Sequence, residues 1–453
     1  MGICQNIFLC LLLSLCSSAG FATSYSVSNL MEQSVVSLDG DWYHSPTLID
    51  PGKLKSVEDL ESFSRKYIRS FISSNPDFSD GIGEQSFVTI IQGVQEEWHQ
   101  LSLQFRADTA ARVYFFPVGE RPLYSGGVGV VSNDRKWHQP QIKDELLKLP
   151  VSKSGDYFLI IQVQNVHNSN GVIWQGPIIG QYHSAYFYWH LNRIIEAIAI
   201  GVILILTLWY LFMYLHRRQE IANLWLAVFC FCVLLRCVAI SGHMFPAFFF
   251  ESNLFVYGLQ RRLEYIPVAI SGASSLGFLV YLLGASGFRR VSHTLMIATS
   301  VFGFIVLVLP LRLLHTLPVL ITMNALLIIS MVFGYIIVAV SVKKKRKGSY
   351  ILATGVIPIM LAVVNDVLVS FGVGDSKIFL VHLGFSCLAF CLGQVVAIRY
   401  AETYRRSEKL GRDLTALNHE LMEKQKSNDH LISELKKLVY PHQVNQIEKG
   451  DSL

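Results

Sequence analysis

The second half of the chain consists mostly of long apolar stretches in which charged residues are almost absent. Residues 197–215, for example, carry no charged side chain. A helix of about 19 residues, rising about 1.5 Å per residue, is long enough to cross the hydrocarbon core of a bilayer. A core helix of a soluble protein would expose a polar stripe, which these stretches lack. The pattern therefore predicts seven membrane-spanning helices, at residues 197–215, 221–240, 265–283, 291–309, 319–342, 350–371 and 378–398.

The N-terminus and the charges between the spans predict the same orientation. Residues 1–22 contain an apolar run at 7–15 followed by small residues, which is typical of a signal peptide cleaved after Ala22. Export of the residues that follow places the links after the first, third, fifth and seventh spans in the cytoplasm. Those links carry the basic residues Arg217, Arg218, 343–347, Arg289, Arg290, Arg405 and Arg406. This bias agrees with the positive-inside rule. We therefore expect a multi-pass protein of the bacterial inner membrane with its N-terminal domain in the periplasm.

Residues 23–190 show a different pattern, with short stretches of alternating apolar and polar residues. The predicted strands are at 34–38, 86–92, 99–106, 112–118 and 156–166. Turn signals separate them at 39–40, 126–127, 133–134, 168–171 and 176–177. Many short strands between such turns favour a β-sandwich or jelly roll. Residues 57–72 are the exception, because their apolar residues keep helical spacing and predict an inserted helix.

Beyond Arg399 the chain is polar but periodic, with leucines at alternating steps of four and three residues. The predicted seam consists of Leu410, Leu414, Leu417, Leu421, Lys424, Asn428, Leu431, Leu435 and Leu438. Such a heptad pattern predicts a parallel coiled coil and hence a homodimer. A solvated single helix is the alternative, but it would show charge without this register. Pro441 then ends the predicted helix.

Composition excludes several functional classes. The 453 residues are 52% hydrophobic and 16% charged, and the net charge is only +5. With no broad basic field and no nucleic-acid-binding motif, we expect no nucleic-acid partner. Residues 23–190 contain no cysteine, so the predicted β domain must be stabilised by its own core. We find no catalytic constellation, cofactor motif or metal-ligand cluster, and we expect an extracytoplasmic ligand and the bilayer as partners.

Two groups of residues are candidates for function. Ligand binding is predicted for a tryptophan- and amide-rich set comprising Trp174, His167, Asn168 and Trp137. Exposed tryptophans stack on sugar faces, so a carbohydrate is one ligand this set would suit. The alternatives are turn formation by the Asn-rich segment and burial of the tryptophans in the core, above all Trp42.

The second group is polar and lies inside the predicted spans. Its members are Arg236, Glu264, Asp366 and His382. A charge within a span costs about 2.5–3.5 kcal/mol on insertion scales, so each needs a partner or water. We predict a contact between Arg236 and Asp366. Snorkelling to the outer headgroups is the alternative, and it suits Glu264 better than the short Asp366 side chain.

Three local stretches carry a family resemblance. Residues 38–42 (LDGDW), residues 165–174 (NVHNSNGVIW) and residues 364–368 (VNDVL) with Gly384 resemble the bacterial seven-transmembrane receptors with diverse intracellular signalling modules. Val166 and Val172 depart from that family's pattern. The resemblance implies an extracellular jelly roll and an enzymatic output domain on the cytoplasmic side. Residues 440–443 also resemble the linker that precedes class III nucleotide cyclase domains in some relatives.

These patterns predict a multidomain membrane protein with five segments. They are a signal peptide at 1–22, an all-β jelly-roll-like sensor domain at 23–190, a seven-helix transmembrane bundle at 191–400, a coiled coil at 401–440 and a short tail at 441–453. The interpretation is a receptor without its own catalytic domain, controlling an output such as a nucleotide cyclase. A transporter or a membrane-anchored binding protein without signalling output is the alternative. A transporter would need polar residues through the full depth of the spans, whose inner halves are almost wholly apolar.

Overall fold

The computed structural model describes residues 35–438 apart from 39, 69–82, 99, 133, 135–136, 168–172, 250–252, 315, 347 and 371–380. The predicted signal peptide and C-terminal tail lie outside the described residues. Two compact units are present. The first comprises residues up to 344 together with 364–379, and the second comprises residues 345–363 and 380 onward.

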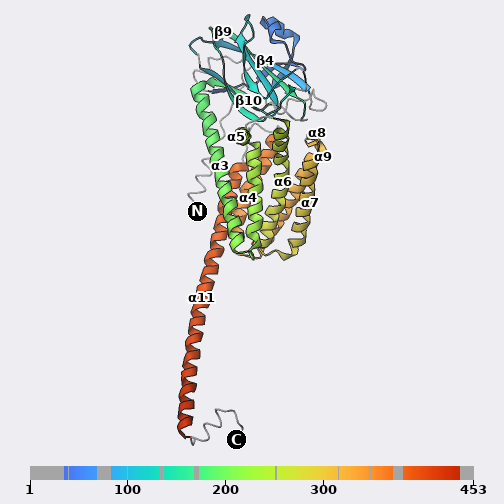
Figure 1. Ribbon diagram of the computed structural model, residues 1–453. Helices are drawn as coiled ribbons and strands as arrows, with labels where there is room; N and C mark the ends of the chain where they lie inside the picture. The colour runs from blue at the N-terminus through green and yellow to red at the C-terminus, as the bar shows by residue number, and fades with distance from the viewer. Residues whose placement is uncertain are drawn as a thin grey trace. The chain divides into compact units, whose positions relative to one another are not determined.

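The N-terminal part of the first unit is a β-sandwich of two antiparallel sheets (Figure 1). One sheet has the order β1 (Val35–Ser37), β10 (Ile173–Gln181), β5 (Leu101–Ala107) and β8 (Lys143–Lys148). The other has the order β3 (Ser64–Ile68), β2 (Gly40–Ser45), β4 (Gly83–Val94), β9 (Gly155–Asn165), β6 (Ala110–Pro117) and β7 (Tyr124–Val128). Each of the five predicted strands coincides with an observed one.

Apolar residues from both sheets form the core of the sandwich. Trp42 is fully buried there, and its indole Nε1 donates to the carbonyl oxygen of Leu38 at 3.0 Å. Trp42 is therefore a core residue. A second cluster covers the other face of the larger sheet, where Ile49, Leu54 and Leu60 pack on residues of β4, β6 and β9. Because β9 is covered on both faces, its residues form a nearly continuous apolar run.

The prediction of a helix at residues 57–72 is wrong. The structure has a short 3-10 helix, η2 (Val57–Ser62), followed by strand β3. The carboxylate of Asp59 accepts hydrogen bonds from the backbone nitrogens of Lys55 and Ser56, at 2.7 and 2.8 Å, and fixes the start of η2. Pairing of β3 with β2 then draws the following residues into the sheet. Of the apolar residues that suggested a helix, Leu60 is buried in the second cluster and Phe63 packs against the same cluster.

Two predicted turns instead lie within strands. Residues 126–127 belong to β7, where a Cβ on Gly127 would collide with the carbonyl oxygen of Ala111 on the neighbouring strand. Residues 176–177 belong to β10, whose pairing with β5 shifts register on both sides of Gln175. Glycine thus marks close backbone approach in β7, and the Gly-Pro pair sits at an irregularity in β10.

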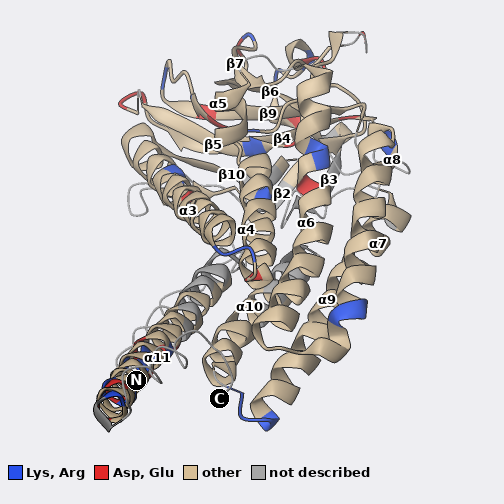
Figure 2. Ribbon diagram, turned by 60° about the horizontal axis from the view of Figure 1, so that its bottom comes forward, with Lys and Arg blue, Asp and Glu red and all other residues tan. Residues whose placement is uncertain are grey.

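Long helices follow the sandwich. They are α3 (Tyr182–His216), α4 (Ile221–Ile240), α6 (Leu254–Leu282), α7 (Arg289–Val308) and α9 (Leu317–Lys343), with the short helices α5 (Met244–Phe248) and α8 (Leu311–Leu314) between them. Within the described residues, these five long helices are the ones long and apolar enough to cross a membrane. Figure 2 shows how sparse charged residues are along α7 and α9. Helix α6 is the most buried of the five and packs against α4, α7 and α9.

Helices α10 (Ser349–Ser370) and α11 (Val381–Leu438) stand at the positions of the last two predicted spans. In the second unit they pack closely, since a Cβ on Gly384 would lie 2.8 Å from the Cα of Ile359. Helix α11 continues without interruption through the predicted seam. Its leucines there, such as Leu410 and Leu421, are 65% and 56% exposed in the single chain.

Candidate functional site

The tight turn between β5 and β6 is one of the parts of the sandwich that reach the helices. It consists of Asp108 and Thr109, both buried. The hydroxyl of Thr109 donates to the carbonyl oxygen of Gln164 at 2.7 Å, which anchors the turn to β9. The turn therefore moves with the sheet, and it presents the Asp108 carboxylate to α6.

Arg261 of α6 receives this carboxylate. Its Nη2 lies 2.9 Å from Oδ2 of Asp108 and donates to the Asp108 carbonyl oxygen at 3.0 Å. Its Nη1 contacts the carboxylate of Glu264 at 2.9 Å. The hydroxyl of Tyr257 also donates to the Asp108 carbonyl oxygen, at 3.1 Å. One guanidinium thus links a turn of the sandwich to two turns of the central helix.

Asp108 and Arg261 are only 2% and 3% exposed. Burial raises the pKa of Asp108 above its ordinary value, while the neighbouring Arg261 opposes that rise. A buried ion pair gains little net stability over an apolar contact, but losing one partner leaves an uncompensated charge. The pair therefore holds the sandwich and α6 in one defined geometry.

A second contact lies at the C-terminal end of α4. Arg106 of β5 donates to the carbonyl oxygen of Ile240, the last residue of that helix. Its Nε lies 3.6 Å from Oδ1 of Asp144 on β8. The backbone nitrogen of Asp144 in turn donates to the carbonyl oxygen of Gly242 at 3.2 Å. The smaller sheet is thus attached to the link between α4 and α5.

The third connection is covalent. Strand β10 ends at Gln181 and α3 begins at Tyr182, with no linker between them. The backbone nitrogen of Tyr182 donates to the carbonyl oxygen of Gln100 at 2.6 Å. The ammonium of Lys148 lies 4.4 Å from the centre of the Tyr182 ring. Three helices, α3, α4 and α6, are therefore tied to the sandwich, and we call these three contacts together the junction.

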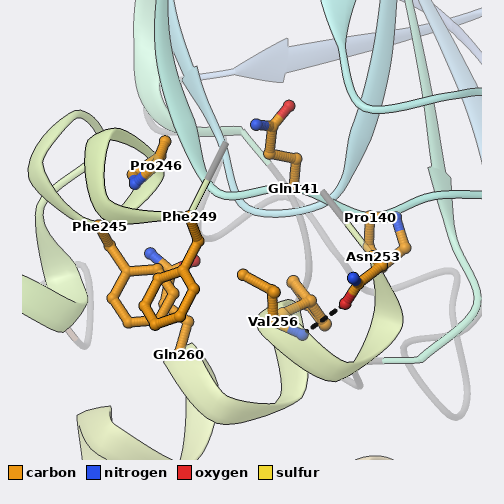
Figure 3. A pocket seen from close by; sticks show the side chains of 9 residues that line it. Pro140, Gln141, Phe245, Pro246, Phe249, Asn253, Val256 and Gln260 are labelled. Carbon is orange, nitrogen blue, oxygen red and sulfur yellow. Dashed lines mark hydrogen bonds between the residues drawn. The ribbon is translucent and has the colours of Figure 1, made fainter. Parts of the chain in front are cut away.

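A partly open hollow lies within the junction (Figure 3). Pro140 and Gln141 of the sandwich line one side, and residues of α5 and α6 line the other. The ring centres of Phe245 and Phe249, which line the hollow, lie 4.8 Å apart. Gln260 of α6 donates to the carbonyl oxygen of Ala239 at 2.8 Å. The sandwich is thus joined to the helices by separate polar contacts with open space beside them.

The predicted polar group in the spans is not brought together in the described residues. Glu264 pairs with Arg261, as described above, and not with another member of the group. Arg236 is exposed on α4. The side chains of Asp366 and His382 lie outside the described residues. The proposed contact between Arg236 and Asp366 therefore stays a prediction.

Sequence reasoning missed the pairing of Asp108 with Arg261. The two residues are 153 positions apart and belong to segments with different periodicities. One signal was present, namely the spacing of three residues between Arg261 and Glu264 at the start of an apolar helix. That spacing shows a local pair, but it contains no information about a third partner in the β domain.

The predicted ligand-binding residues are described only in part. Trp137 is 69% exposed on the sandwich. His167 is half-buried, and its ring centre lies 5.6 Å from that of His138, the residue next to Trp137. The structure thus brings the segments of Trp137 and His167 close together. The side chains of Asn168 and Trp174 lie outside the described residues, so the role of this set stays a prediction.

Comparison with known proteins gives one family match. Residues 192–399 match the sequence model of a family described as 7TM diverse intracellular signalling. No curated protein matches the chain. Among solved structures, the apo β-glucuronidase from Ruminococcus gnavus is 13% identical with a TM-score of 0.21, over 32% of this chain and 29% of that chain. The same enzyme with D-glucuronic acid gives 16% identity and a TM-score of 0.21, with the same coverage. This chain spans under a third of those structures, and at such TM-scores the likeness supports no functional conclusion.

The family match begins within α3 and ends within α11. It contains α4, α6, α7 and α9, and it includes Arg261 and Glu264 of the junction. The segment is apolar enough to cross a membrane several times. Residues 192–399, just under half of the chain, therefore match the 7TM diverse intracellular signalling family, and this match supports a transmembrane signalling receptor.

Proposed function

We propose that this protein is a receptor of the bacterial inner membrane in which a periplasmic β-sandwich controls a cytoplasmic helix through seven membrane spans. The observation that carries the proposal is the buried ion pair between Asp108 of the sandwich and Arg261 of α6. A membrane anchor for a binding domain would need only the covalent link to α3. The additional contacts tie the sandwich to helices that follow later in the chain.

The attachment of the sandwich to α6 supports a relay of conformational change from the sandwich to the bundle. This helix packs against three other long helices, so a displacement of its outer end affects much of the bundle. Packed helices change position in small discrete steps and do not deform continuously. A ligand that shifts the β5–β6 turn would therefore favour one arrangement of the spans over another.

The output side of the proposal rests on α11. At about 1.5 Å per residue, its 58 residues form a helix about 87 Å long. Six seam leucines, Leu410, Leu414, Leu417, Leu421, Leu431 and Leu435, are at least 56% exposed in the single chain. A second copy in a parallel coiled coil would cover them. The resulting pair of helices would transmit the signal to an output domain, for which a class III nucleotide cyclase is one candidate.

The relay can be tested by distance measurements in the cytoplasmic helices. A spin label at Leu417→Cys in nanodiscs reports the separation between two copies of α11. We expect Asp108→Asn to change the distance distribution, because it removes the charge that holds α6 to the sandwich. Glu220→Gln is the matched control, since it removes a carboxylate from the exposed pair with Arg217. Identical distributions for the unmodified chain and Asp108→Asn would overturn the relay.

A further inference from the structure

Aromatic and basic side chains from three helices meet at the end of the bundle away from the sandwich (Figure 1). Trp225 stands near the start of α4, Tyr281 near the end of α6, and Arg289, Arg290 and His293 near the start of α7. The rings of Trp225 and Tyr281 are stacked with their centres 6.3 Å apart. His293 lies edge-on to Trp225 at 5.9 Å, and its Nε2 lies 3.2 Å from the Tyr281 hydroxyl. We call these five residues the basal cluster.

The basal cluster is anchored by Trp225, whose side chain is buried. A Cβ on Gly277 of α6 would collide with the Trp225 indole, so this glycine lets the ring pack directly on the helix. The indole in turn contacts the rings of Tyr281 and His293. The guanidinium of Arg289 lies over the Tyr281 ring, 5.2 Å from its centre, which is within the range of a cation–π contact. The aromatic rings thus hold a cation at a defined place.

The two arginines of the basal cluster lack acidic partners. Arg289 and Arg290 are both exposed, and neither forms an ion pair within the part of the chain that the structure describes. Residues 265–365 contain no aspartate or glutamate. Glu220, in the neighbouring link between α3 and α4, is paired with Arg217. The two guanidiniums therefore remain available to an external anion.

The face of α7 that begins at Arg290 continues as an apolar row. Ile297, Val301, Phe304 and Val308 follow Arg290 at steps of seven, four, three and four residues, so all five lie on one side of the helix. The four apolar side chains are 54% to 69% exposed. From Arg290 to Val301 the helix rises about 16 Å, which is close to half the thickness of a hydrocarbon core. A cationic end followed by such a row matches the headgroup and acyl chain of one phospholipid.

We propose that the basal cluster binds a phospholipid with a net negative headgroup, whose phosphate contacts Arg289 and Arg290 and whose acyl chain lies along the apolar row of α7. The planar donors of a guanidinium match the oxygens of a phosphate. Tryptophan and tyrosine favour the depth at which headgroups lie. A zwitterionic headgroup would bring its own cation close to the arginines, so an anionic lipid is preferred.

The bound lipid would stabilise the packing of the helices. Arg289 and Arg290 are adjacent and repel each other, and an anion between them offsets that repulsion. The contacts that hold α7 to α4 and α6 pass through the same cluster, from His293 to Trp225 and from Arg289 to Tyr281. Basic clusters between helices at a membrane surface are suited to anionic headgroups for this reason. The inference requires helices that span a membrane, and it does not depend on the proposed relay.

The test uses the full chain with a bimane label at Ile297→Cys, in vesicles of equal parts phosphatidylglycerol and phosphatidylcholine. Ile297 is 66% exposed, and it lies about 10 Å along the helix from Arg290. Bromine atoms, which quench bimane, are placed on the acyl chains of one lipid or of the other, so the two bilayers are otherwise identical. Two arginines correspond to roughly tenfold selectivity for the anionic lipid. We therefore expect brominated phosphatidylglycerol to cause most of the quenching. Equal quenching in the two samples would overturn the site.

Variants show whether the selectivity comes from the basal cluster. Arg289→Gln combined with Arg290→Gln should abolish the difference between the two samples. Lys344→Gln combined with Lys345→Gln is the matched control, because it also removes two exposed positive charges, at the end of α9. This control should keep the difference, and equal losses in the two double variants would assign the selectivity to overall surface charge and overturn the site.

Two further measurements complete the test. If the glutamine variant of the arginines does not insert, Tyr281→Leu decides, since it removes the ring beneath Arg289 and keeps every charge. It should reduce the selectivity, and an unchanged selectivity overturns the site. Replacing chloride by inorganic phosphate at constant ionic strength distinguishes a lipid from a soluble anion. We expect no effect, because only a lipid also covers the apolar row. Loss of the difference in phosphate would mean that the arginines bind a soluble anion and would overturn the lipid site.

Discussion

The polar residue with the largest expected effect on stability is Arg261, because its charge is buried and shared between three oxygen atoms. Removing one partner of a buried ion pair typically costs about 3–5 kcal/mol, whereas an exposed pair contributes about 0–1 kcal/mol. We expect Asp108→Asn and Arg261→Met each to lower the free energy of unfolding by a few kcal/mol. The loss in the double variant should be much smaller than the sum of the losses in the two single variants.

The measurement is a double-mutant cycle on thermal or denaturant unfolding in micelles. The exposed pair of Arg217 and Glu220, with side chains 47% and 42% exposed, is the matched control and should show almost no coupling. Additive losses for Asp108 and Arg261 would mean that the two side chains do not interact in the folded protein.

His138 makes the stability of the sandwich depend on pH. Its side chain is buried, and its Nε2 donates to the carbonyl oxygen of Gln164 at 3.0 Å. Burial lowers its pKa, against the opposing effects of that hydrogen bond and of Glu84. The unfolded chain therefore takes up a proton at a higher pH than the folded domain does. The contribution of neutral His138 to the free energy of unfolding is therefore fully present above about pH 6.5, and it is lost as the pH decreases below that value.

We expect residues 23–190, expressed alone, to melt at a lower temperature at pH 5 than at pH 7.5. His138→Gln should flatten that dependence, because glutamine can donate the same hydrogen bond without titrating. The exposed His183→Gln serves as the control. A pH profile that His138→Gln leaves unaltered would assign the dependence to other residues.

At the scale of elements, the sequence predicted those whose pattern arises from burial. The long helices were predicted because length and apolarity together leave few alternatives. Strand β9 was predicted as one of the alternating stretches of residues 23–190, and in the structure it is buried along nearly its whole length. Strands β2, β3, β7, β8 and β10 were missed, and three of them, β3, β7 and β8, lie at an edge of their sheet. An edge strand has one partner and an exposed side, so residues such as those of β8 (KDELLK) show little alternation.

The packing of α10 against α11 depends on small residues and gives a prediction at this scale. A Cβ on Gly384 would lie 2.8 Å from the backbone of Ile359, whereas one on Gly393 of the same helix would meet nothing within 4 Å. Gly384→Ala should therefore force the helices apart. Gly393→Ala should be neutral or stabilising by up to about 1 kcal/mol, since alanine is the better helix former.

Disulfide formation offers a direct measurement of this packing. The hydroxyl of Thr354 on α10 lies 3.9 Å from the sulfur of Cys391 on α11, so Thr354→Cys should crosslink to Cys391 under mild oxidation. We expect Gly384→Ala to slow this crosslinking and Gly393→Ala to leave it unchanged. Equal rates in the two variants would show that Gly384 does not set the distance between the helices.

The whole molecule shows what local patterns leave out. Local sequence patterns predicted the strands, the long apolar helices and the heptad repeat separately, because each pattern is a property of neighbouring residues. The junction depends on which turn of one part meets which helix of another, as Asp108 meets Arg261. That information is distributed over contacts between residues more than 100 positions apart. A charged residue near the end of a span is thus a reason to look for a partner in the adjoining domain.

The seam of α11 provides the last prediction, which concerns assembly. The leucines of the seam are exposed in the single chain, and a solvated helix gains nothing from such a regular stripe. Asn428 occupies an a position and Lys424 a d position of the heptad. An asparagine at a pairs with its equivalent in a parallel two-stranded coil and fixes register at some cost in stability. These two weak layers between leucine layers would let the coil adopt two arrangements of similar free energy.

Leu421→Cys and Leu435→Cys, each made as a single substitution, should form a disulfide between two copies of the chain in native membranes. Leu421 and Leu435 flank the weak layers, so their crosslinking rates report on both halves of the coil. Asn428→Ile combined with Lys424→Leu should raise the melting temperature of the coil and relax its choice of oligomer, because apolar side chains remove the constraint that asparagine imposes. A cysteine at Lys426, an exposed f position on the side of the helix away from the seam, is the matched control and should crosslink poorly. If Leu421→Cys and Leu435→Cys crosslink no faster than Lys426→Cys, α11 does not form the parallel dimer, and the signal must leave the membrane by another route.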